Sequence, residues 1–435
     1  MPELASPSAF SRVTHLASQR CVHEAFQWLH LRERKIMDWQ AELVAVAAPS
    51  FHEAARAAWL CERFRQLGLE QVEIDASGNA IGFAPPTAAP LPSAEPECVL
   101  ISAHLDTVFP GGQAILPERE GTCLKAPGAC DNGAGLAGLL AIAAALGAIR
   151  ESESALNLSR GILFAGNVGE EGEGDLRGIR YLYQQSPWMK RIAANLVLDG
   201  AGHEIVVTEA LGSRRFLVTI NAPGGHSWTD AGLPNPIMLL SKAISRMGEI
   251  KLSESPRTTL NVGTISGGTS VNTIPESAAA RFDFRSTDPE QLIRLEVELH
   301  RAVEDVVLGA NRHTGSGRRP TGATAKPSGR ESMVSFHIQR IGDRPAAKLP
   351  DNTRILELLR AVDRHLGIRT EIRTASTDAN IPLSLGIEAV SIGAGGDGGG
   401  VHTYAEWYDS RDREIGLKRV LLLLLALAEA PPNPI

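Results

Sequence analysis

The sequence has little of several features that would indicate a function from composition alone. Aromatic residues make up only 5% of its 435 residues, and its formal net charge is -7. The basic footprint of a nucleic-acid-binding protein is therefore missing. The longest apolar run, residues 420–428, is too short to span a bilayer, and we expect a buried terminal helix there. We predict neither a nucleic-acid nor a membrane partner.

Cysteine is also scarce. The chain has five, at positions whose spacing fits no metal-binding motif: Cys21, Cys61, Cys98, Cys123 and Cys130. Their odd number speaks against a complete disulfide framework. The first ten residues, MPELASPSAF, contain neither the basic segment nor the apolar core of an export signal. We expect reduced thiols and a cytoplasmic protein.

What the sequence does contain is an alternation of strand and helix patterns. A chain of this length exceeds one ordinary core, which predicts two domains. Apolar strands over 98–102, 161–166 and 195–198 are interleaved with a helix over 133–149. Before them come helical spacing over 15–48 and 53–67 and a hairpin of 72–74 with 80–83. This order predicts an α/β domain whose mixed, mostly parallel sheet is flanked by helices.

The pattern changes near residue 212. Strands with period-two alternation follow at 215–220, 260–265, 278–285 and 334–341, with helices over 237–250 and 289–308 between them. This β-α-β-β-α-β order is typical of a ferredoxin-like α+β domain. From about residue 348 the α/β pattern resumes. We therefore expect residues 1–212 and 347–435 to form one domain, interrupted by an inserted domain over 213–346.

Five potential metal ligands lie at strand ends or in glycine-rich turns. They are His104, Asp131, Glu171, Asp199 and His402. Singly, each is explained as well by a helix cap, a turn or a surface side chain. Together, imidazole and carboxylate ligands suit zinc, and also cobalt or manganese. Five ligands exceed one open tetrahedral site and fit two metals if one carboxylate bridges them. Asp131 is the natural bridge, because the glycines around it allow close backbone approach.

Two short segments add acids beside these ligands. In His104-Leu105-Asp106 the carboxylate can orient the histidine ring. In Glu170-Glu171 the adjacent acids can divide the work, one binding metal and the other moving protons. The pattern indicates a metal-dependent hydrolase.

Seven segments in order along the chain strengthen this interpretation. They are SAHLDTV from Ser102, GACDNGAG from Gly128, GEEG from Gly169, LDG from Leu198, PGGHS from Pro223, GGTSVNTIP from Gly267, and VHT from Val401. With them the chain resembles the dinuclear-zinc exopeptidase and deacylase family of peptidase T, glutamate carboxypeptidase, aminoacylase, carnosinase and acetylornithine deacetylase. The motifs are most similar to those of the peptidase-T-like members.

The resemblance implies a role for each residue of the site. His104, Asp131 and Asp199 would hold one metal, and Asp131, Glu171 and His402 the other. Asp106 would hydrogen-bond to His104, and Glu170 would be the general base acting on a metal-bridging water. The resemblance also implies a cis peptide after Asp131, and it makes the inserted domain a lid that forms a homodimer.

The inserted domain then contributes to the site as well. In dimeric members of the family, the histidine equivalent to His226 reaches the partner's active site and stabilises the oxyanion. Asn272 and Arg285 become candidates for substrate binding, although Arg285 could equally be a surface charge on a strand. Asp378 and Glu406 could support the metal site or act as caps.

The resulting hypothesis is hydrolysis of an amide bond in small peptides by a di- or tripeptidase-like exopeptidase. Asp199 favours a peptidase, because several carboxypeptidase- and deacetylase-like members of the family have glutamate there. One alternative is a deacylase of N-acyl amino acids. Another is a catalytically silent homologue that only binds peptides.

Overall fold

The computed structural model describes residues 7–88, 96–111, 116–152, 156–315 and 333–429. It divides into two compact units, one of residues 1–210 with 348–435 and the other of residues 211–347. The boundaries expected from the sequence lie within two residues of these, since 212 compares with 210 and 347 with 348. Each unit is described by itself.

The first unit is built on a nine-stranded sheet in the order β1-β2-β6-β3-β7-β17-β8-β15, with β16 beside β8. The pairs β3–β6, β3–β7, β7–β17 and β8–β16 are parallel, whereas β1–β2, β2–β6 and β8–β17 are antiparallel. The mixed, mostly parallel sheet is therefore confirmed. Its strands are β1 (Glu70–Ile74), β2 (Ala80–Ala84), β3 (Cys98–His104), β6 (Gly161–Asn167), β7 (Ile192–Leu198), β8 (Ile205–Ala210), β15 (Ala347–Lys348), β16 (Glu371–Ala375) and β17 (Glu388–Ile392).

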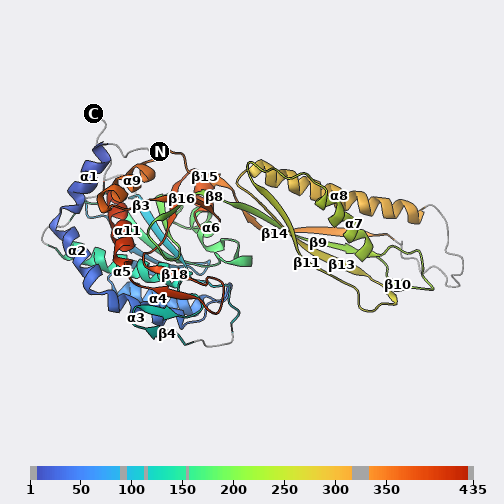
Figure 1. Ribbon diagram of the computed structural model, residues 1–435, viewed down its shortest axis with the longest axis horizontal. Helices are drawn as coiled ribbons and strands as arrows, with labels where there is room; N and C mark the ends of the chain where they lie inside the picture. Colours follow the sequence, from blue (N-terminus) through green and yellow to red (C-terminus); the bar gives the residue numbers. More distant parts are fainter. Residues whose placement is uncertain (1–6, 89–95, 112–115, 153–155, 316–332, 430–435) are drawn as a thin grey trace. The chain divides into compact units, whose positions relative to one another are not determined.

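Helices cover both faces of this sheet (Figure 1). Leu163 of β6 belongs to an apolar cluster with Leu182 of α6 (Arg177–Gln184) and Ile381 of α10 (Asn380–Ser384). The next residue, Phe164, faces the opposite side and packs against Phe64 of α4 (Ala54–Gln66). Beside α4 runs α5 (Gly133–Glu151), which contacts α11 (Arg413–Ala428), and α9 (Arg354–Leu366) packs on α11.

The long helix α5 is the one helix among the described residues with the length and apolar composition of a membrane span. Its most apolar window is 78% buried inside the structure. Glycine and alanine at many of its positions leave little side-chain bulk, so the helix lies close to its neighbours. The terminal helix α11, expected around the apolar run 420–428, is likewise buried along that run.

The N-terminal helical stretch differs from the prediction. The sequence shows continuous helical spacing over 15–48, but the structure has three helices, α1 (Pro7–Ala17), α2 (Arg20–Leu31) and α3 (Glu33–Val44). The chain leaves helical geometry at Gln19 and at Arg32, where no proline or glycine marks a break. The breaks let α2 and α3 each pack against α5.

A second, small sheet in the first unit was not predicted. Its order is β18-β19-β5-β4, from β4 (Glu118–Glu120), β5 (Cys123–Lys125), β18 (Asp397–Gly399) and β19 (Trp407–Asp409). It pairs segments almost 300 residues apart, because Tyr408 lies opposite Leu124. This sheet holds two loops that matter for the site, one before α5 and one before β19.

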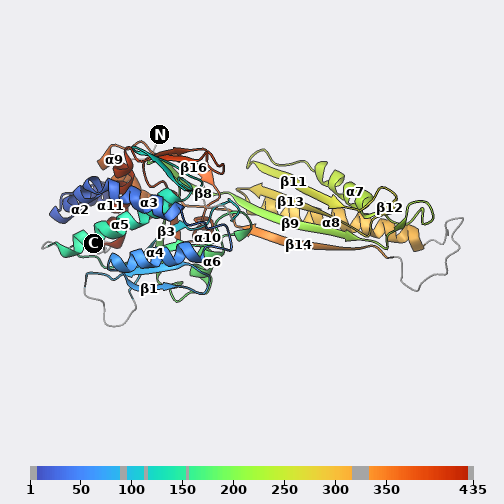
Figure 2. The ribbon, with the colours of Figure 1, turned by 90° about the horizontal axis from the view of Figure 1, so that it is seen from below.

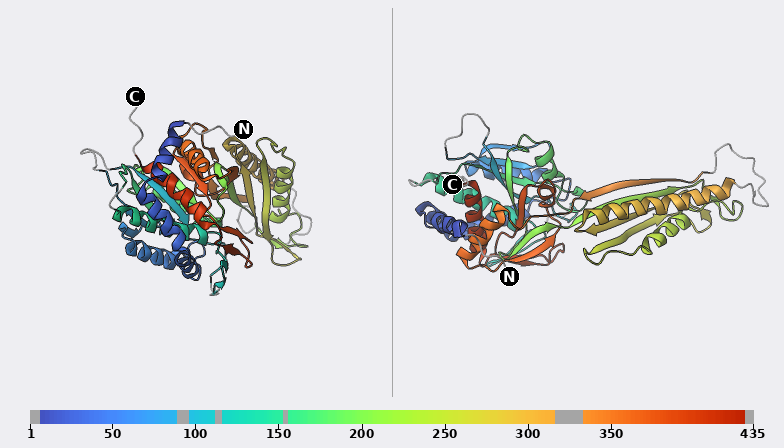
Figure 3. Two further views of the ribbon diagram at one scale, coloured as in Figure 1. Left: turned by 60° about the vertical axis from the view of Figure 1, so that its left-hand side comes forward. Right: turned by 90° about the horizontal axis from the view of Figure 1, so that it is seen from above.

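The second unit is the expected ferredoxin-like domain. Its four long strands are antiparallel in the order β11-β13-β9-β14. Both long helices lie on one face of the sheet (Figure 2). There their leucines and valines pack in one apolar cluster with Phe216, Phe282 and Phe284. The elements are β9 (Gly212–Asn221), β10 (Gly225–His226), α7 (Pro236–Gly248), β11 (Thr258–Gly267), β12 (Thr273–Ile274), β13 (Ser277–Ser286), α8 (Pro289–Gly315) and β14 (Ser335–Arg344). The views in Figure 3 show the same one-sided arrangement.

Candidate dinuclear metal centre

The site lies at the carboxyl ends of three neighbouring parallel strands, β6, β3 and β7. His104 is the last residue of β3, Glu170 and Glu171 follow β6, and Asp199 follows β7. Parallel strands end at the same edge of a sheet, so residues distant in sequence meet there. The central sheet therefore supplies four of the site's side chains.

The other two ligands, Asp131 and His402, come from loops held by the small sheet. Buried Glu406 joins these loops, because its carboxylate accepts the backbone N–H groups of Gly128, Cys130 and Asp131 at 2.7–2.8 Å. The N–H of Ala126 in turn donates to the carbonyl of Glu406. The His402 segment is thus fixed against the Asp131 segment.

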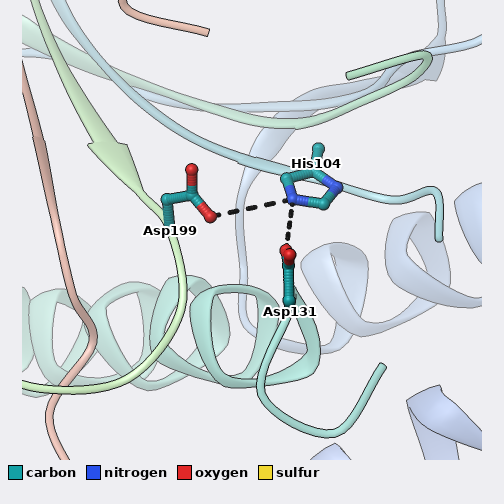
Figure 4. A group of neighbouring side chains, drawn as sticks. All are labelled: His104, Asp131 and Asp199. Carbon is teal, nitrogen blue, oxygen red and sulfur yellow. Dashed lines mark hydrogen bonds and ion pairs between the residues drawn. The ribbon is translucent and has the colours of Figure 1, made fainter. Parts of the chain in front are cut away.

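The ligand atoms form two groups that share Asp131. In the first, Nε2 of His104 lies 2.9 Å from Oδ1 of Asp131 and 3.8 Å from Oδ1 of Asp199 (Figure 4). In the second, Nε2 of His402 lies 3.1 Å from Oδ2 of Asp131 and 3.0 Å from Oε1 of Glu171. Within each group the three ligand atoms lie within 4.8 Å of one another. The two oxygens of Asp131 therefore serve different groups, as a bridging carboxylate must.

Glu170 lies close to both groups of candidate ligands. Its carboxylate is within 4.8 Å of ligand atoms of His104 and Glu171, and the side chain is buried. This geometry suits a base beside the metals and would equally suit a further ligand. The two adjacent acids do reach one site from a single turn.

Asp106 is placed differently from the expectation. Nδ1 of His104 hydrogen-bonds to the main-chain carbonyl of Asp106 at 3.0 Å, whereas the Asp106 carboxylate is 3.7 Å away. That carboxylate instead accepts the N–H groups of Glu170 and Glu171, each at 2.9 Å. Asp106 thus orients His104 through its backbone, leaving Nε2 for a metal, and holds the turn of the paired acids through its side chain.

The charges of the side chains at this site favour the binding of cations. Burial opposes the charged imidazole of His104, but the carboxylates of Asp131 and Asp199 outweigh it and raise the pKa of His104 well above its ordinary value. A hydrogen bond to Asp131 raises the pKa of His402 to about 9. Burial disfavours ionised Asp131, yet hydrogen bonds from both histidines lower its pKa. Protons on the imidazoles thus compensate the carboxylates, and metal ions would displace them.

Two side chains that the sequence reasoning missed complete the centre. The Ser50 hydroxyl lies 2.7 Å from Oδ2 of Asp106 and 3.2 Å from the carbonyl of Glu171. Asn132 donates to the Leu198 carbonyl and accepts the N–H of Gly200, so it joins the Asp131 segment to the Asp199 segment. The Asp131–Asn132 peptide is cis, as the resemblance implies. Ser50 gave no signal in the sequence beyond ending a helical stretch.

In the second unit, His226 and Asn272 lie side by side and both are exposed. His226 in β10 pairs with Thr273 in β12, and the N–H of Ser227 donates to the Asn272 carbonyl. Nδ1 of His226 accepts the N–H groups of Trp228 and Thr229 at 3.2 and 3.4 Å. The proton of a neutral ring then sits on Nε2, where it can be donated.

Arg285 does not join this pair. It is near the far end of β13, eight residues from Ser277, which at strand spacing is about 26 Å. Its Nε donates to Asp283 on the same strand at 2.7 Å. Nothing in the structure of the second unit brings Arg285 to His226 and Asn272.

Two protein-family models each match a part of the chain. Residues 87–214 match the model of Peptidase family M28, and residues 208–310 match that of the Peptidase dimerisation domain. The motif-based resemblance is confirmed. The first match covers the segments with His104, Asp131, Glu170, Glu171 and Asp199, and the second covers those with His226 and Asn272.

Individual proteins extend the likeness over more of the chain. The uncharacterised protein YqjE of Bacillus subtilis is 26% identical over 374 residues, which are 84% of this chain and 91% of that protein. A probable carboxypeptidase of Aspergillus clavatus is 28% identical over a region that makes up 57% of this chain and 56% of that protein.

Solved structures show the same fold. That of aminopeptidase PepT from Bacillus cereus has a TM-score of 0.67 at 20% identity, covering 91% of this chain and 99% of PepT. YXEP of Bacillus subtilis, described as a dinuclear metal-binding peptidase of the M20 family, has a TM-score of 0.62 at 14% identity. The superposed region covers 92% of this chain and 99% of the YXEP chain.

Proposed function

We propose that this protein is a dinuclear metal-dependent exopeptidase that hydrolyses an amide bond in small peptides. The observation that carries the proposal is the pair of three-residue groups sharing Asp131. The match to a peptidase family and the likeness to a dinuclear metal-binding peptidase support it. An N-acyl amino acid deacylase remains the second candidate, since the same centre hydrolyses either amide.

The donor set fits two divalent cations. It offers imidazole nitrogens from His104 and His402 and carboxylate oxygens from Asp131, Asp199 and Glu171, with no thiolate, which suits zinc and also cobalt or manganese. When bound, two such ions would polarise the scissile carbonyl and acidify a water, the usual contribution of dinuclear sites to hydrolysis.

Glu170 is assigned the proton transfers. Its backbone is fixed by Asp106, and its buried carboxylate lies beside His104 and Glu171 without belonging to either group that contains Asp131. A carboxylate in that place can take a proton from the attacking water and deliver it to the leaving amine. Asp106 and Ser50 keep the turn, and therefore this base, in position.

We assign to His226 the stabilisation of the oxyanion that forms when the amide is attacked. Its Nε2–H is the donor left by the hydrogen bonds to Nδ1. The match to a peptidase dimerisation domain supports a homodimer in which this donor acts on the partner's site. Asn272, tied to His226 through backbone pairing, would bind substrate beside it. Arg285 lies in none of the seven segments and stays a weaker proposal for substrate binding than Asn272.

The cellular setting is proposed from the thiols. All five cysteines are free and four of them are buried. Free thiols are usual in a reducing compartment, which supports a cytoplasmic enzyme.

The decisive experiment replaces Glu170 with glutamine. Glu170→Gln should keep both metals and lower kcat on di- and tripeptides by about 10²–10⁴-fold, the usual contribution of a general base. Metal analysis and steady-state kinetics measure both quantities. Glu173→Gln, at an exposed position three residues on, is the matched control and should resemble wild type.

Each outcome separates two assignments. Unchanged turnover would refute Glu170 as the base. Loss of a metal equivalent would make Glu170 a ligand instead. A wild-type enzyme that hydrolyses N-acyl amino acids but no peptide would favour the deacylase.

A further inference from the structure

A cavity of about 200 Å³ lies in the first unit, lined by segments that also carry residues of the metal centre. Thr107 of its wall directly follows Asp106, and Tyr404 lies two residues after His402. Pro127 lies four residues before Asp131. Three of the segments that form the cavity therefore reach the metal site within a few residues.

Most of the side chains that line the cavity are apolar, and polar atoms also reach its surface. Apart from Arg56, its described residues are alanines, prolines, a valine and a glycine, with Thr107, Phe109 and Tyr404. No carboxylate is among the described lining residues. The rings of Phe109 and Tyr404 are tilted against each other at 5.2 Å, and Tyr404 is 62% exposed. Such a wall offers an aromatic surface to a ligand and, among the described residues, no carboxylate that would compensate a cationic group.

The buried guanidinium of Arg56 stabilises the wall. Its Nε and Nη2 donate to the Val46 carbonyl at 2.9 and 2.6 Å, and Nη1 donates to the Leu105 carbonyl at 2.7 Å. These bonds tie the segment after α3 to the strand end that carries His104. The N–H of Thr107 adds a bond to the Ala48 carbonyl at 2.9 Å. The cavity is thus formed by fixed backbone before any ligand binds.

We propose that this cavity receives an apolar side chain, aromatic or branched aliphatic, of the residue next to the scissile amide. The proposal rests on the peptidase function and names a class of substrate for it. Pockets for whole drug-sized ligands occupy about 300–1,000 Å³, so this volume suits one side chain rather than a whole peptide. Peptides with glycine or a charged residue at that position would be poor substrates.

The kinetic test compares di- and tripeptides that carry glycine, lysine, leucine or phenylalanine at each position. At one position, replacing glycine by leucine or phenylalanine should raise kcat/KM about 10- to 200-fold. The peptide with lysine at that position should have a low kcat/KM. Phe109→Ala, which removes one ring of the wall, should lower kcat/KM for the phenylalanine peptide about 10-fold and spare the glycine peptide. Phe10→Ala, on α1 outside the cavity, is its control and should change neither.

A second variant fills the space. Ala47→Phe should lower kcat/KM for the phenylalanine and leucine peptides and spare the glycine peptide. Ala58→Phe adds the same bulk at an exposed position of α4 that does not line the cavity, and it should leave the preference intact. An unchanged ratio of phenylalanine to glycine peptides in both Phe109→Ala and Ala47→Phe would overturn the proposal.

A binding measurement keeps this inference separate from the proposed function. Phenylalaninamide should bind the zinc-loaded protein at least about tenfold more tightly than glycinamide, and Ala47→Phe should abolish the difference. Saturation-transfer NMR on the Glu170→Gln protein, in which hydrolysis of either amide should be slow, measures the difference in binding. Equal binding of the two amides would overturn the cavity assignment. Preferential binding without hydrolysis of any peptide would refute the peptidase and leave the cavity assignment standing.

Discussion

The two units hold most of their candidate residues differently, although His402 of the first unit is exposed like those of the second. In the first unit, His104, Asp106, Glu170 and Glu171 are buried and hydrogen-bonded into one cluster. In the second unit, His226 and Asn272 are exposed, and their neighbours hold their backbone but do not surround their side chains. The first unit gathers the five candidate metal ligands, whereas the second presents an exposed imidazole and amide.

The difference matches the two roles proposed for the units, metal binding for the first and oxyanion stabilisation for the second. Metal ligands must be fixed closely, so they sit on sheet ends with supporting hydrogen bonds from the same unit. An oxyanion donor only has to arrive at the reacting atoms when substrate is present. Changes to the candidate ligands of the first unit should therefore remove metal and activity together, while changes to His226 in the second unit should remove activity and leave metal bound.

The largest effect is expected at Asp131, because both groups use its carboxylate. Asp131→Asn should bind fewer than two metals per chain and lose at least about 10³-fold in kcat/KM, since each metal contributes several kcal/mol to hydrolysis. Metal analysis after dialysis and peptide hydrolysis measure the two quantities.

Asp199→Asn sharpens this prediction, because Asp199 lies in only one group. It should lose one metal equivalent and keep the other. Two full equivalents in Asp131→Asn, with the fold intact by circular dichroism, would contradict the bridge.

The second unit supplies the next prediction. His226→Ala should keep both metals and lower kcat by about 10²–10³-fold, as the loss of one oxyanion donor does. Metal content and kcat on the same preparation test the contrast between the units directly. Loss of metal in this variant would contradict the claim that the second unit affects activity without affecting metal binding.

A mixing experiment tests whether His226 acts across a dimer. Subunits with Glu170→Gln and subunits with His226→Ala should each be nearly inactive alone and regain activity when refolded together. A mixed dimer would then contain one site with both residues intact. No recovery, or an active enzyme that is strictly monomeric by ultracentrifugation, would contradict action in trans.

Much of the fold could be predicted because local patterns carry it. Alternation in β9 and β13 and the apolar runs of β3 and β6 follow directly from which faces are buried. The three N-terminal helices could not be separated, because Ser18-Gln19 and Arg32 are compatible with helix and only packing on α5 bends the chain there. The small sheet also escaped prediction, because its three-residue strands form two short pairs that are joined into one sheet only by β5 and β19, which lie far apart along the chain.

The site divides in the same way. The clustering of candidate ligands such as His104 and Asp199 could be predicted, because both lie at strand ends and a parallel sheet brings strand ends together. The partner of His104 Nδ1 was predicted wrongly in detail: it is the backbone carbonyl of Asp106, not the carboxylate. Sequence cannot distinguish the two, since both belong to one residue. Ser50 could not be found either, because its contact with Glu171 joins positions 121 residues apart.

Ser50 gives the smallest expected effect and the finest test of the first unit. Its hydroxyl hydrogen-bonds to Asp106 and lies beside the carbonyl of Glu171, yet it touches no proposed ligand atom. Ser50→Ala should weaken the more loosely held metal about tenfold, at the lower end of the effect of residues that support ligands, and lower kcat/KM in proportion at limiting metal. Chelator competition measures the affinity. Ser50→Thr, which retains the hydroxyl, should restore it, and Ser18→Ala, at an exposed turn before α2, should have no effect. Wild-type affinity in Ser50→Ala would mean that Asp106 holds the turn of the paired acids without help.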